Sequence, residues 1–213
     1  MERRLGGSEQ NLLIAQGNLA NTYARLGQRE KALRMRRDVY SGTSKLHGEQ
    51  NKHSLAQAFN YGKDLIDLQR FEEAKSLMRK MMPVARRVLR ENHDCILMMR
   101  WAYARALYQD TGATLDDLRE AVDTLEELER TARRVLGGAH PDAVEIEKSL
   151  REARAELNAQ LRAAYKEDPS SLSADDCARA EQLLARDARK AAKKAARSVS
   201  SETPPSPSPS ESV

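Results

Sequence analysis

The chain has 213 residues, which is enough for one domain of ordinary size and a tail. Hydrophobic residues make up 40% of it, aromatic residues 4% and charged residues 32%, with a formal net charge of +4. So few aromatic residues in a chain rich in Ala, Leu, Arg and Glu favour helices over a sheet core. The small net charge does not by itself imply a nucleic-acid partner.

The cysteines and apolar runs give no indication of export or membrane insertion. Cys95 and Cys177 lie far apart without CxxC spacing, which argues against a disulfide framework or a zinc site and fits a reducing compartment. The first residues contain no apolar run typical of a signal peptide. The longest strongly apolar run, residues 96–99, is too short to span a bilayer. These features predict a soluble, cytoplasmic protein.

The first predicted helix pair covers about residues 9–45. Apolar residues at steps of three and four predict an amphipathic helix from Glu9 to Leu26, and Gly27 ends it. A second helix is expected from about Arg29 to Tyr40, followed by a turn or a frayed helix end at residues 41–44, Ser-Gly-Thr-Ser.

The second and third pairs are expected at about residues 52–90 and 94–136. Pro83 lies inside the second helix of its pair and predicts a bend or two abutting helices, because an interior proline removes a backbone donor. The third pair carries five extra residues around residues 111–114.

Three further segments complete the chain. Residues 141–165 are predicted to form a capping helix with Pro141 at its first position, since the last repeat of a solenoid needs cover for its apolar face. Residues 166–199 are expected to contain a linker and a basic Ala/Lys/Arg helix. The Ser/Pro-rich residues 200–213 cannot bury enough apolar surface to fold and are predicted to be disordered.

The helix pairs repeat along the chain. Similar residues recur at positions 42 residues apart, and a fixed period between 20 and 50 residues is typical of stacked supersecondary units. The recurring positions include Leu19, Tyr61 and Tyr103; Ala20, Gly62 and Ala104; Tyr23, Leu65 and Leu107; and Leu26 and Leu68. We expect the small residues to allow close helix packing and the larger ones to fill the space between helices.

Three motifs characterise the repeat. The first unit contains Asn18-Leu19-Ala20-x-x-Tyr23, then Gly27 and Glu30-Lys31-Ala32-Leu33. The second unit contains the corresponding motifs Asn60-Tyr61-x-x-x-Leu65 and Phe71-Glu72-Glu73-Ala74. Residues 136–142 read Leu-Gly-Gly-Ala-His-Pro-Asp. Together they resemble the tetratricopeptide repeat in the 42-residue form of kinesin light chains, over about residues 5–158. The third unit departs from the pattern, with Ala102 in place of the Asn.

The resemblance implies an all-α fold, a right-handed superhelical solenoid of antiparallel helix pairs. It also implies that the first helices line a concave groove that binds a peptide or a partner helix. By alignment, the groove-facing residues are Asn18, Asn21, Arg25, Asn60, Lys63 and Arg105. Asn side chains can bond a peptide backbone, and the cations favour an acidic ligand. The alternative is that these are ordinary solvated residues on exposed helix faces.

No motif indicates catalysis, a cofactor or a metal. His93 and His140 occupy the same linker position, where a structural role is expected, and neither HExxH nor a glycine-rich phosphate loop occurs. The carboxylate pairs Asp116-Asp117 and Glu126-Glu127 are expected on helix surfaces, without a partner that would shift a pKa. Met and aromatic residues around Trp101 are expected in the core. The sequence therefore predicts no enzyme and no small-molecule substrate.

A basic stripe in the last helix, residues 186–197, permits three interpretations. It is a solvated helix face, a nucleic-acid or nuclear-import patch, or a contact with an anionic membrane. The opposite face is mostly alanine, which weakens the membrane interpretation. This stripe is the only candidate for nucleic-acid binding. Thr203, Ser206 and Ser208 each precede a proline and are candidate sites for proline-directed phosphorylation.

The function predicted from the sequence is a non-catalytic protein–protein interaction module, an adaptor or scaffold that binds a peptide or helix in its groove. The alternative is a regulatory or self-associating repeat fragment of a larger signalling protein. Leu5-Gly6-Gly7 has the same sequence as Leu136-Gly137-Gly138, so we expect it to end a helix and open a turn. Such a beginning is expected for a naturally short array or for a fragment of a longer one.

Overall fold

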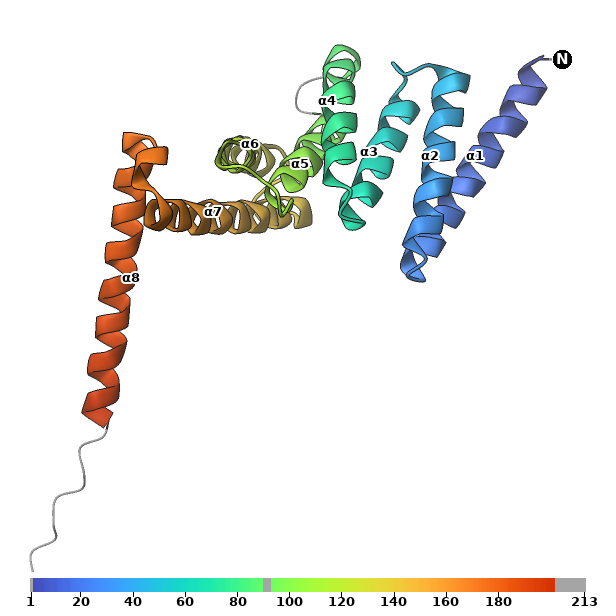
Figure 1. Ribbon diagram of the computed structural model, residues 1–213. Helices are drawn as coiled ribbons and strands as arrows, with labels where there is room; N and C mark the ends of the chain where they lie inside the picture. The colour runs from blue at the N-terminus through green and yellow to red at the C-terminus, as the bar shows by residue number, and fades with distance from the viewer. Residues whose placement is uncertain (1, 90–92, 202–213) are drawn as a thin grey trace, which may run out of the picture. The chain divides into compact units, whose positions relative to one another are not determined.

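A computed structural model describes residues 2–89 and 93–201, with side chains for residues 8–89 and 93–193. Within these ranges the regular structure is helical, as predicted (Figure 1). The helices are α1 (Glu2–Arg25), α2 (Arg29–His47), α3 (Lys52–Asp67), α4 (Phe71–Val88), α5 (Asp94–Tyr108), α6 (Leu115–Val135), α7 (Pro141–Glu167) and α8 (Ala174–Ser201), with a short 3₁₀ helix at Pro169–Ser171. The tail predicted to be disordered lies outside the described residues from residue 202 onward.

The helices pack as consecutive antiparallel pairs. Each of α1 to α5 contacts the helix that follows it, and α3 also contacts α5. In Figure 1, α1 to α4 stand side by side, and α5 and α6 are turned relative to them as the stack twists. The predicted solenoid of helix pairs is confirmed.

The chain divides into two compact units, Met1–Leu157 and Asn158–Val213, so that α7 contributes to both. In the second unit, Leu161 of α7 and Ala180 of α8 are fully buried, and Arg162 pairs with Asp187 at 2.9 Å between the two helices. Tyr165 donates a hydrogen bond to Glu181 at 2.7 Å. The division into an array, a linker with a basic helix and a tail stays a prediction.

The repeated small residues lie where the helices approach one another. Ala20 and Ala104 are fully buried, and Gly62 is buried beside Met78. A Cβ atom added at Gly62 would come within 2.0 Å of the Met78 methyl carbon. Leu107 fills the space between helices, with no exposed surface. The recurring small positions therefore lie in the core, as expected, whereas Leu19 and Leu26 of the first unit are exposed.

The turn predicted at residues 41–44 is wrong, because α2 continues through it to His47. Thr43 is buried, and a Cβ atom on Gly42 would come within 2.7 Å of the Leu13 side chain. The glycine thus allows α1 to pack closely against α2 instead of ending the helix.

A second expected interruption is also wrong, and one of the two alternatives at Pro83 is excluded. α1 begins at Glu2 and runs through Leu5-Gly6-Gly7, which therefore do not open a turn. Glycine lowers helix stability by about 1 kcal/mol per residue but does not forbid a helix. α4 is one helix from Phe71 to Val88 with Pro83 inside it, so the alternative of two abutting helices is excluded.

The five extra residues of the third pair form a well-bonded connection into α6. The Asp110 carboxylate accepts hydrogen bonds from the Gly112 backbone N–H at 3.0 Å and from the buried Lys75 ammonium at 3.1 Å. Thr114 and Asp117 form a reciprocal capping box at the start of α6. The longer loop is therefore anchored to α4 and still begins a regular helix.

Candidate functional site

α1 and α3 end in the same kind of turn. The N–H of Gln28 donates to the Tyr23 carbonyl, and the N–H of Arg70 donates to the Leu65 carbonyl, both at 2.9 Å. The residue in the left-handed conformation is Gly27 in the first turn, with φ of 76°, and Gln69 in the second, with φ of 60°. These matched turns position the last turns of α1 and α3 and the start of the helix that follows each.

A depression of about 200 Å³ lies between these helix ends. Its lining comes from the last turn of α1, the first turn of α2 and the end of α3. The lining residues are Ala24, Arg25, Arg29, Ala32, Lys63, Asp64 and Asp67. Two of the six predicted groove residues, Arg25 and Lys63, therefore line one depression.

A third predicted residue, Asn21, joins the depression through the buried Arg36 of α2. Arg36 donates from Nη2 to the Asn21 side-chain oxygen at 2.7 Å and from Nε to the Asp64 carboxylate at 3.1 Å. The exposed fraction of the Arg36 side chain is 6%. A buried guanidinium is stable only when it is paired and hydrogen-bonded, so this network fixes α1, α2 and α3 in register.

Asp67 connects the depression to α5. Its backbone carbonyl accepts from Arg29 Nη1 at 3.2 Å, and its carboxylate lies 3.8 Å from both Lys63 Nζ and Arg105 Nη2. Arg105 is thus the fourth predicted residue in the cluster. Arg25, in contrast, has no ion pair among the residues that the structure describes.

The charges of this cluster are not balanced. Asp64 is bonded to the buried Arg36, and the Asp67 carboxylate pairs with Lys63 and Arg105. Arg25 and Arg29 add two further cations to the lining. The four cations of this site are therefore Arg25, Arg29, Lys63 and Arg105. We call these four residues the cationic cluster. A cleft with an excess of one charge attracts ligands of the opposite charge.

The other two predicted residues are not brought into the depression. Asn18 is exposed, and its backbone carbonyl accepts a hydrogen bond from the Thr22 side chain. Asn60 is half-buried on α3. By helical spacing, Asn18 shares a face of α1 with Asn21 and Arg25, so it extends the same surface along the helix.

Sequence reasoning missed Arg29, Arg36, Asp64 and Asp67. Asp64 and Asp67 follow Lys63 on α3, so their place near the groove was readable from helical spacing. The role of Arg36 depends on a contact between three helices, which no local pattern encodes.

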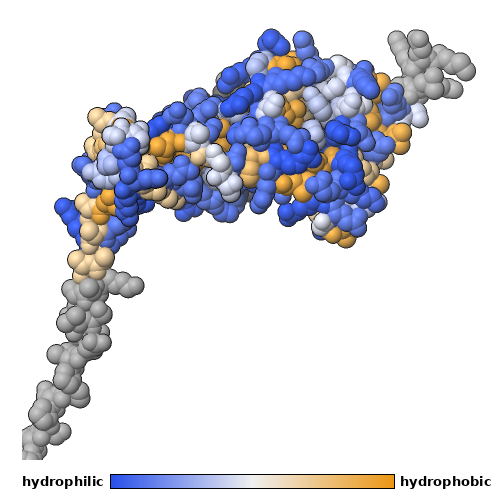
Figure 2. All heavy atoms as spheres, viewed as in Figure 1, coloured by the Kyte–Doolittle hydropathy of each residue, from blue (hydrophilic) through white to orange (hydrophobic). Residues whose placement is uncertain are grey.

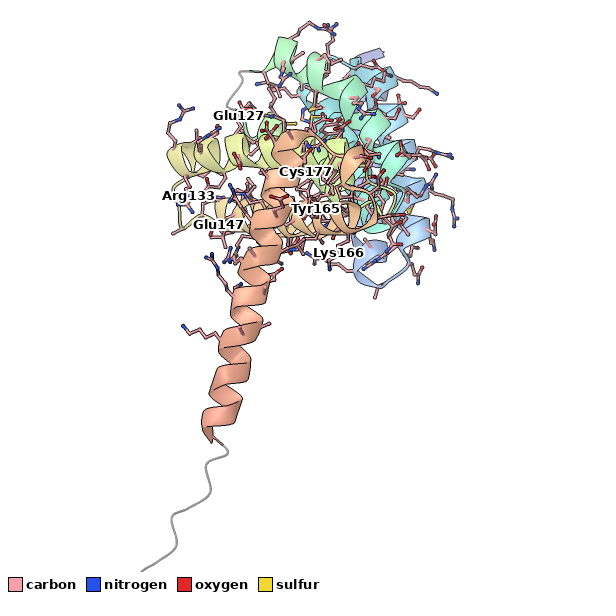
Figure 3. All side chains as sticks on the ribbon, turned by 60° about the vertical axis from the view of Figure 1, so that its left-hand side comes forward. Glu127, Arg133, Glu147, Tyr165, Lys166 and Cys177 are labelled. Carbon is pink, nitrogen blue, oxygen red and sulfur yellow. The ribbon has the colours of Figure 1, made fainter. Side chains whose placement is uncertain are left out.

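A second charged surface lies between α6 and the first part of α7, and its lining includes Arg130, Arg133, Arg151 and Arg154. Arg133 donates to Glu147 at 3.1 Å and Arg154 donates to Glu126 at 2.7 Å; Arg133 and Glu147 are labelled in Figure 3. Two of these arginines therefore already have carboxylate partners, unlike Arg25 in the depression.

The expectation that surface carboxylates lack partners is wrong. The Asp117 carboxylate accepts a hydrogen bond from the Thr114 backbone N–H, which lowers its pKa. The Arg100 guanidinium, 2.5 Å from Glu127, lowers the pKa of that carboxyl. Both pairs join neighbouring structural elements, so the shifts reflect packing of the array and not a reaction centre.

Other reactive groups are in structural positions. The ring nitrogens of His93 and His140 each accept a backbone N–H at 3.2 Å, from Cys95 and Asp142, so their predicted structural role is confirmed. Burial raises the pKa of the Cys95 thiol. Across residues 2–89 and 93–201, no three His, Cys, Asp or Glu side chains are grouped to hold a metal ion. None of the helices in this part is long and apolar enough to cross a membrane.

Comparison with known proteins agrees with this geometry. The family model for the tetratricopeptide repeat matches residues 12–53, which run from α1 to the start of α3. The sequence has no significant match among curated proteins.

Two solved structures are similar over most of the chain. The TPR-like repeats of a protein described as a kinesin light chain from Podosopora anserina have a TM-score of 0.61 and 23% identity, and the match covers 89% of this chain and 93% of that one. BtubC (BKLC) from P. vanneervenii has a TM-score of 0.55 and 18% identity, and the match covers 96% of this chain and 70% of that one. At these identities the likeness shows a shared fold.

Proposed function

We propose that this chain, a tetratricopeptide repeat array with a kinesin light chain-like fold, is a non-catalytic module that binds an acidic peptide or helix end. The fold is that of an interaction scaffold. The observation that carries the proposal is the cationic cluster: Arg25, Arg29 and Lys63 line the depression, and Arg105 pairs with Asp67 of the same lining. Asp67 is the carboxylate left to balance them, since Asp64 pairs with Arg36.

The neighbouring amides complement the cations. Asn18 is exposed one turn before Asn21 on α1 and can bond the backbone of an extended peptide, whatever its side chains. Asn21 already accepts from Arg36, which leaves its side-chain NH₂ as a donor. Amides would thus hold the peptide backbone while the cationic cluster selects acidic side chains or a terminal carboxylate.

The proposal is tested with labelled peptide pools and the full chain. Fluorescence anisotropy would compare pools rich in Asp and Glu, in Lys and Arg, and in neutral residues. The groove variant carries Arg25→Gln, Lys63→Gln and Arg105→Gln. The matched control carries Arg34→Gln, Arg87→Gln and Arg134→Gln, which remove three exposed arginines from the second helices of the pairs.

We expect the acidic pool to bind best and the groove variant to lose about tenfold in affinity, since each exposed charge contact contributes up to about 1 kcal/mol. The control should bind like the natural chain. Equal losses in both variants would show attraction by net charge alone, and binding of the basic pool would contradict the proposal. Circular dichroism establishes that the variants keep their helices.

We extend the proposal to the environment of the protein. The free thiols of Cys95 and Cys177 fit a reducing compartment, and we place the chain in the cytoplasm. Arg186, Arg189 and Lys193 of α8 are exposed, as expected for a basic stripe. The side chains of Lys194 and Arg197 lie outside the described residues. We assign this stripe no nucleic-acid function.

A further inference from the structure

One side of α1 is apolar and uncovered. Leu12 and Leu19 of α1, and Leu26 directly after its end, are seven residues apart, which places them along one side of the helix. Their exposed fractions are 58%, 43% and 66%. Ala15 lies between the first two and is also exposed. We call these four residues the leucine stripe. The opposite side of α1 packs on α2, with Ala20 fully buried.

The repeat shows what covers the equivalent side in the rest of the array. The counterparts of the three leucines are Ser54, Tyr61 and Leu68 on α3, and Ile96, Tyr103 and Asp110 on and after α5. In each set, two of the three residues contact the second helix of the preceding pair.

On α3, Ser54 donates to the Thr43 carbonyl of α2, and Tyr61 stacks on Tyr40 with ring centroids 6.2 Å apart. At the α5 end of the array, the Tyr103 hydroxyl accepts from Arg79 of α4 at 3.0 Å, and Asp110 pairs with Lys75. The equivalent face of α3 and of α5 is therefore covered by the preceding helix. On α1 the same face, the leucine stripe, is exposed.

The chemistry of the stripe indicates cover by something apolar. A row of large apolar side chains exposed on a helix marks an interaction site. α1 carries leucines at the positions where α3 and α5 have Ser, Tyr and Asp among their residues. Figure 2 shows apolar atoms at the α1 end of a surface that is otherwise largely hydrophilic.

The charge pattern identifies the partner. From Ser8 to Ala24, α1 has a single charged residue, Glu9, although 32% of the chain is charged. The stripe is bordered by neutral amides such as Asn11 and Asn18. Arg25, next to Leu26, places a charge at one end of the stripe. Along the rest of it a charged partner would find no counter-charge, whereas an identical surface would meet no repulsion.

The other end of the first unit does not match the stripe. The exposed residues of α7 there include Glu145, Lys148 and Arg151. Head-to-tail stacking of two copies would press leucines against these charges, which makes a two-fold arrangement with like ends together the favourable one.

We propose that the leucine stripe is a homodimer interface, in which α1 of one copy packs against α1 of a second copy about a two-fold axis. In the dimer, α1 of the second copy covers the leucine stripe, as the preceding helix covers the equivalent face of α3 and of α5. It does not use the depression, so the dimer leaves the cationic cluster available. A single helix pair gives an interface at the low end of the size range, so we expect a dissociation constant of roughly tens of micromolar.

The test is the mass of the full chain by sedimentation equilibrium from about 1 to 500 μM, a range that brackets a weak interface. The stripe variant carries Leu12→Gln, Leu19→Gln and Leu26→Gln; glutamine is a good helix former. The matched control carries Val135→Gln and Val144→Gln, two exposed apolar residues elsewhere in the array.

We expect the natural chain and the control to dimerise with rising concentration, and the stripe variant to associate at least about tenfold more weakly. A natural chain that is monomeric throughout the range, or a stripe variant that dimerises like the control, would overturn the proposal.

A crosslinking measurement keeps the test decisive if the triple variant unfolds. Leu19→Cys in a chain with Cys95→Ser and Cys177→Ser should give a disulfide-linked dimer under mild oxidation, because residue 19 lies at the centre of the stripe. Val144→Cys in the same background should not. Equal crosslinking at both positions would contradict a specific interface.

Discussion

The first and third helix pairs share one backbone plan but differ in how much of it is buried. α5 lies among α3, α4 and α6, and ten of its fifteen residues are buried. α1 packs on α2 and exposes the leucine stripe. At one repeat position, Leu107 of α5 is fully buried, whereas Tyr23 of α1 is half-buried. The comparison teaches that place in the stack, more than the repeat pattern, sets what a residue contributes to stability.

The largest expected effect comes from that shared position. Leu107→Ala should lower the free energy of unfolding by about 2–5 kcal/mol, because it leaves a cavity in a close-packed core. Tyr23→Ala should cost less than half as much, since water already reaches the ring. Urea unfolding followed by circular dichroism measures both. Equal losses would show that the first pair is as well packed as the third.

The next effect concerns the buried cation that anchors the third pair. Lys75 is 5% exposed in its side chain and bonds Asp110 at 3.1 Å. Lys75→Ala should destabilise the chain by about 1–3 kcal/mol, because it removes a charged hydrogen bond from a buried position. The exposed Lys63→Ala is the control and should change stability by less than about 1 kcal/mol. A Lys75→Ala chain with unchanged stability would mean that the hydrogen bond from the Gly112 N–H is enough to hold the loop.

Acid should weaken the third pair selectively. The Gly112 backbone N–H and the Lys75 ammonium lower the pKa of Asp110, and the Thr114 backbone N–H lowers that of Asp117. Because both folded pKa values lie below the unfolded ones, these carboxylates stabilise the fold above about pH 4 and lose that effect as the pH falls through the folded values.

Urea unfolding at a series of pH values between about 6 and 2 checks this, since that range brackets the unfolded pKa. A chain with Asp110→Asn and Asp117→Asn should start less stable and decline less steeply with acid. A decline as steep as that of the natural chain would place the acid sensitivity elsewhere.

The smallest effect comes from the two matched turns. Gln69→Gly should stabilise the chain by about 1 kcal/mol, since a residue with a Cβ atom is strained at a φ of 60°. Gly27→Ala should cost a similar amount in the first pair. Thermal unfolding of the two variants measures the difference. A destabilised Gln69→Gly chain would show that the glutamine side chain makes a contact that outweighs the strain.

Much of the fold was predictable because the repeat places like residues in like positions. The 42-residue spacing located the helix pairs and the small core residues Ala20, Gly62 and Ala104. Gly42 misled the prediction: a glycine that allows a close helix contact and one that opens a turn look alike in sequence. Only the facing side chain, Leu13, distinguishes them.

The candidate site was predictable in part for the same reason. Alignment with the tetratricopeptide repeat pattern placed Asn21, Arg25, Lys63 and Arg105 in the groove, and the structure groups them near one depression. The bonds that hold this group together come from Arg36, whose partners lie on α1 and α3. Such contacts depend on how three helices pack, so composition and period do not reveal them.

The most direct test of the proposed groove is a site-resolved titration. Backbone amide NMR signals of the full chain would be followed as an acidic peptide is added. We expect the largest shifts at residues 21–32, 63–67 and 105, around the cationic cluster. Shifts confined to the paired charges between α6 and α7, or to the basic stripe of α8, would contradict a groove on the first helices.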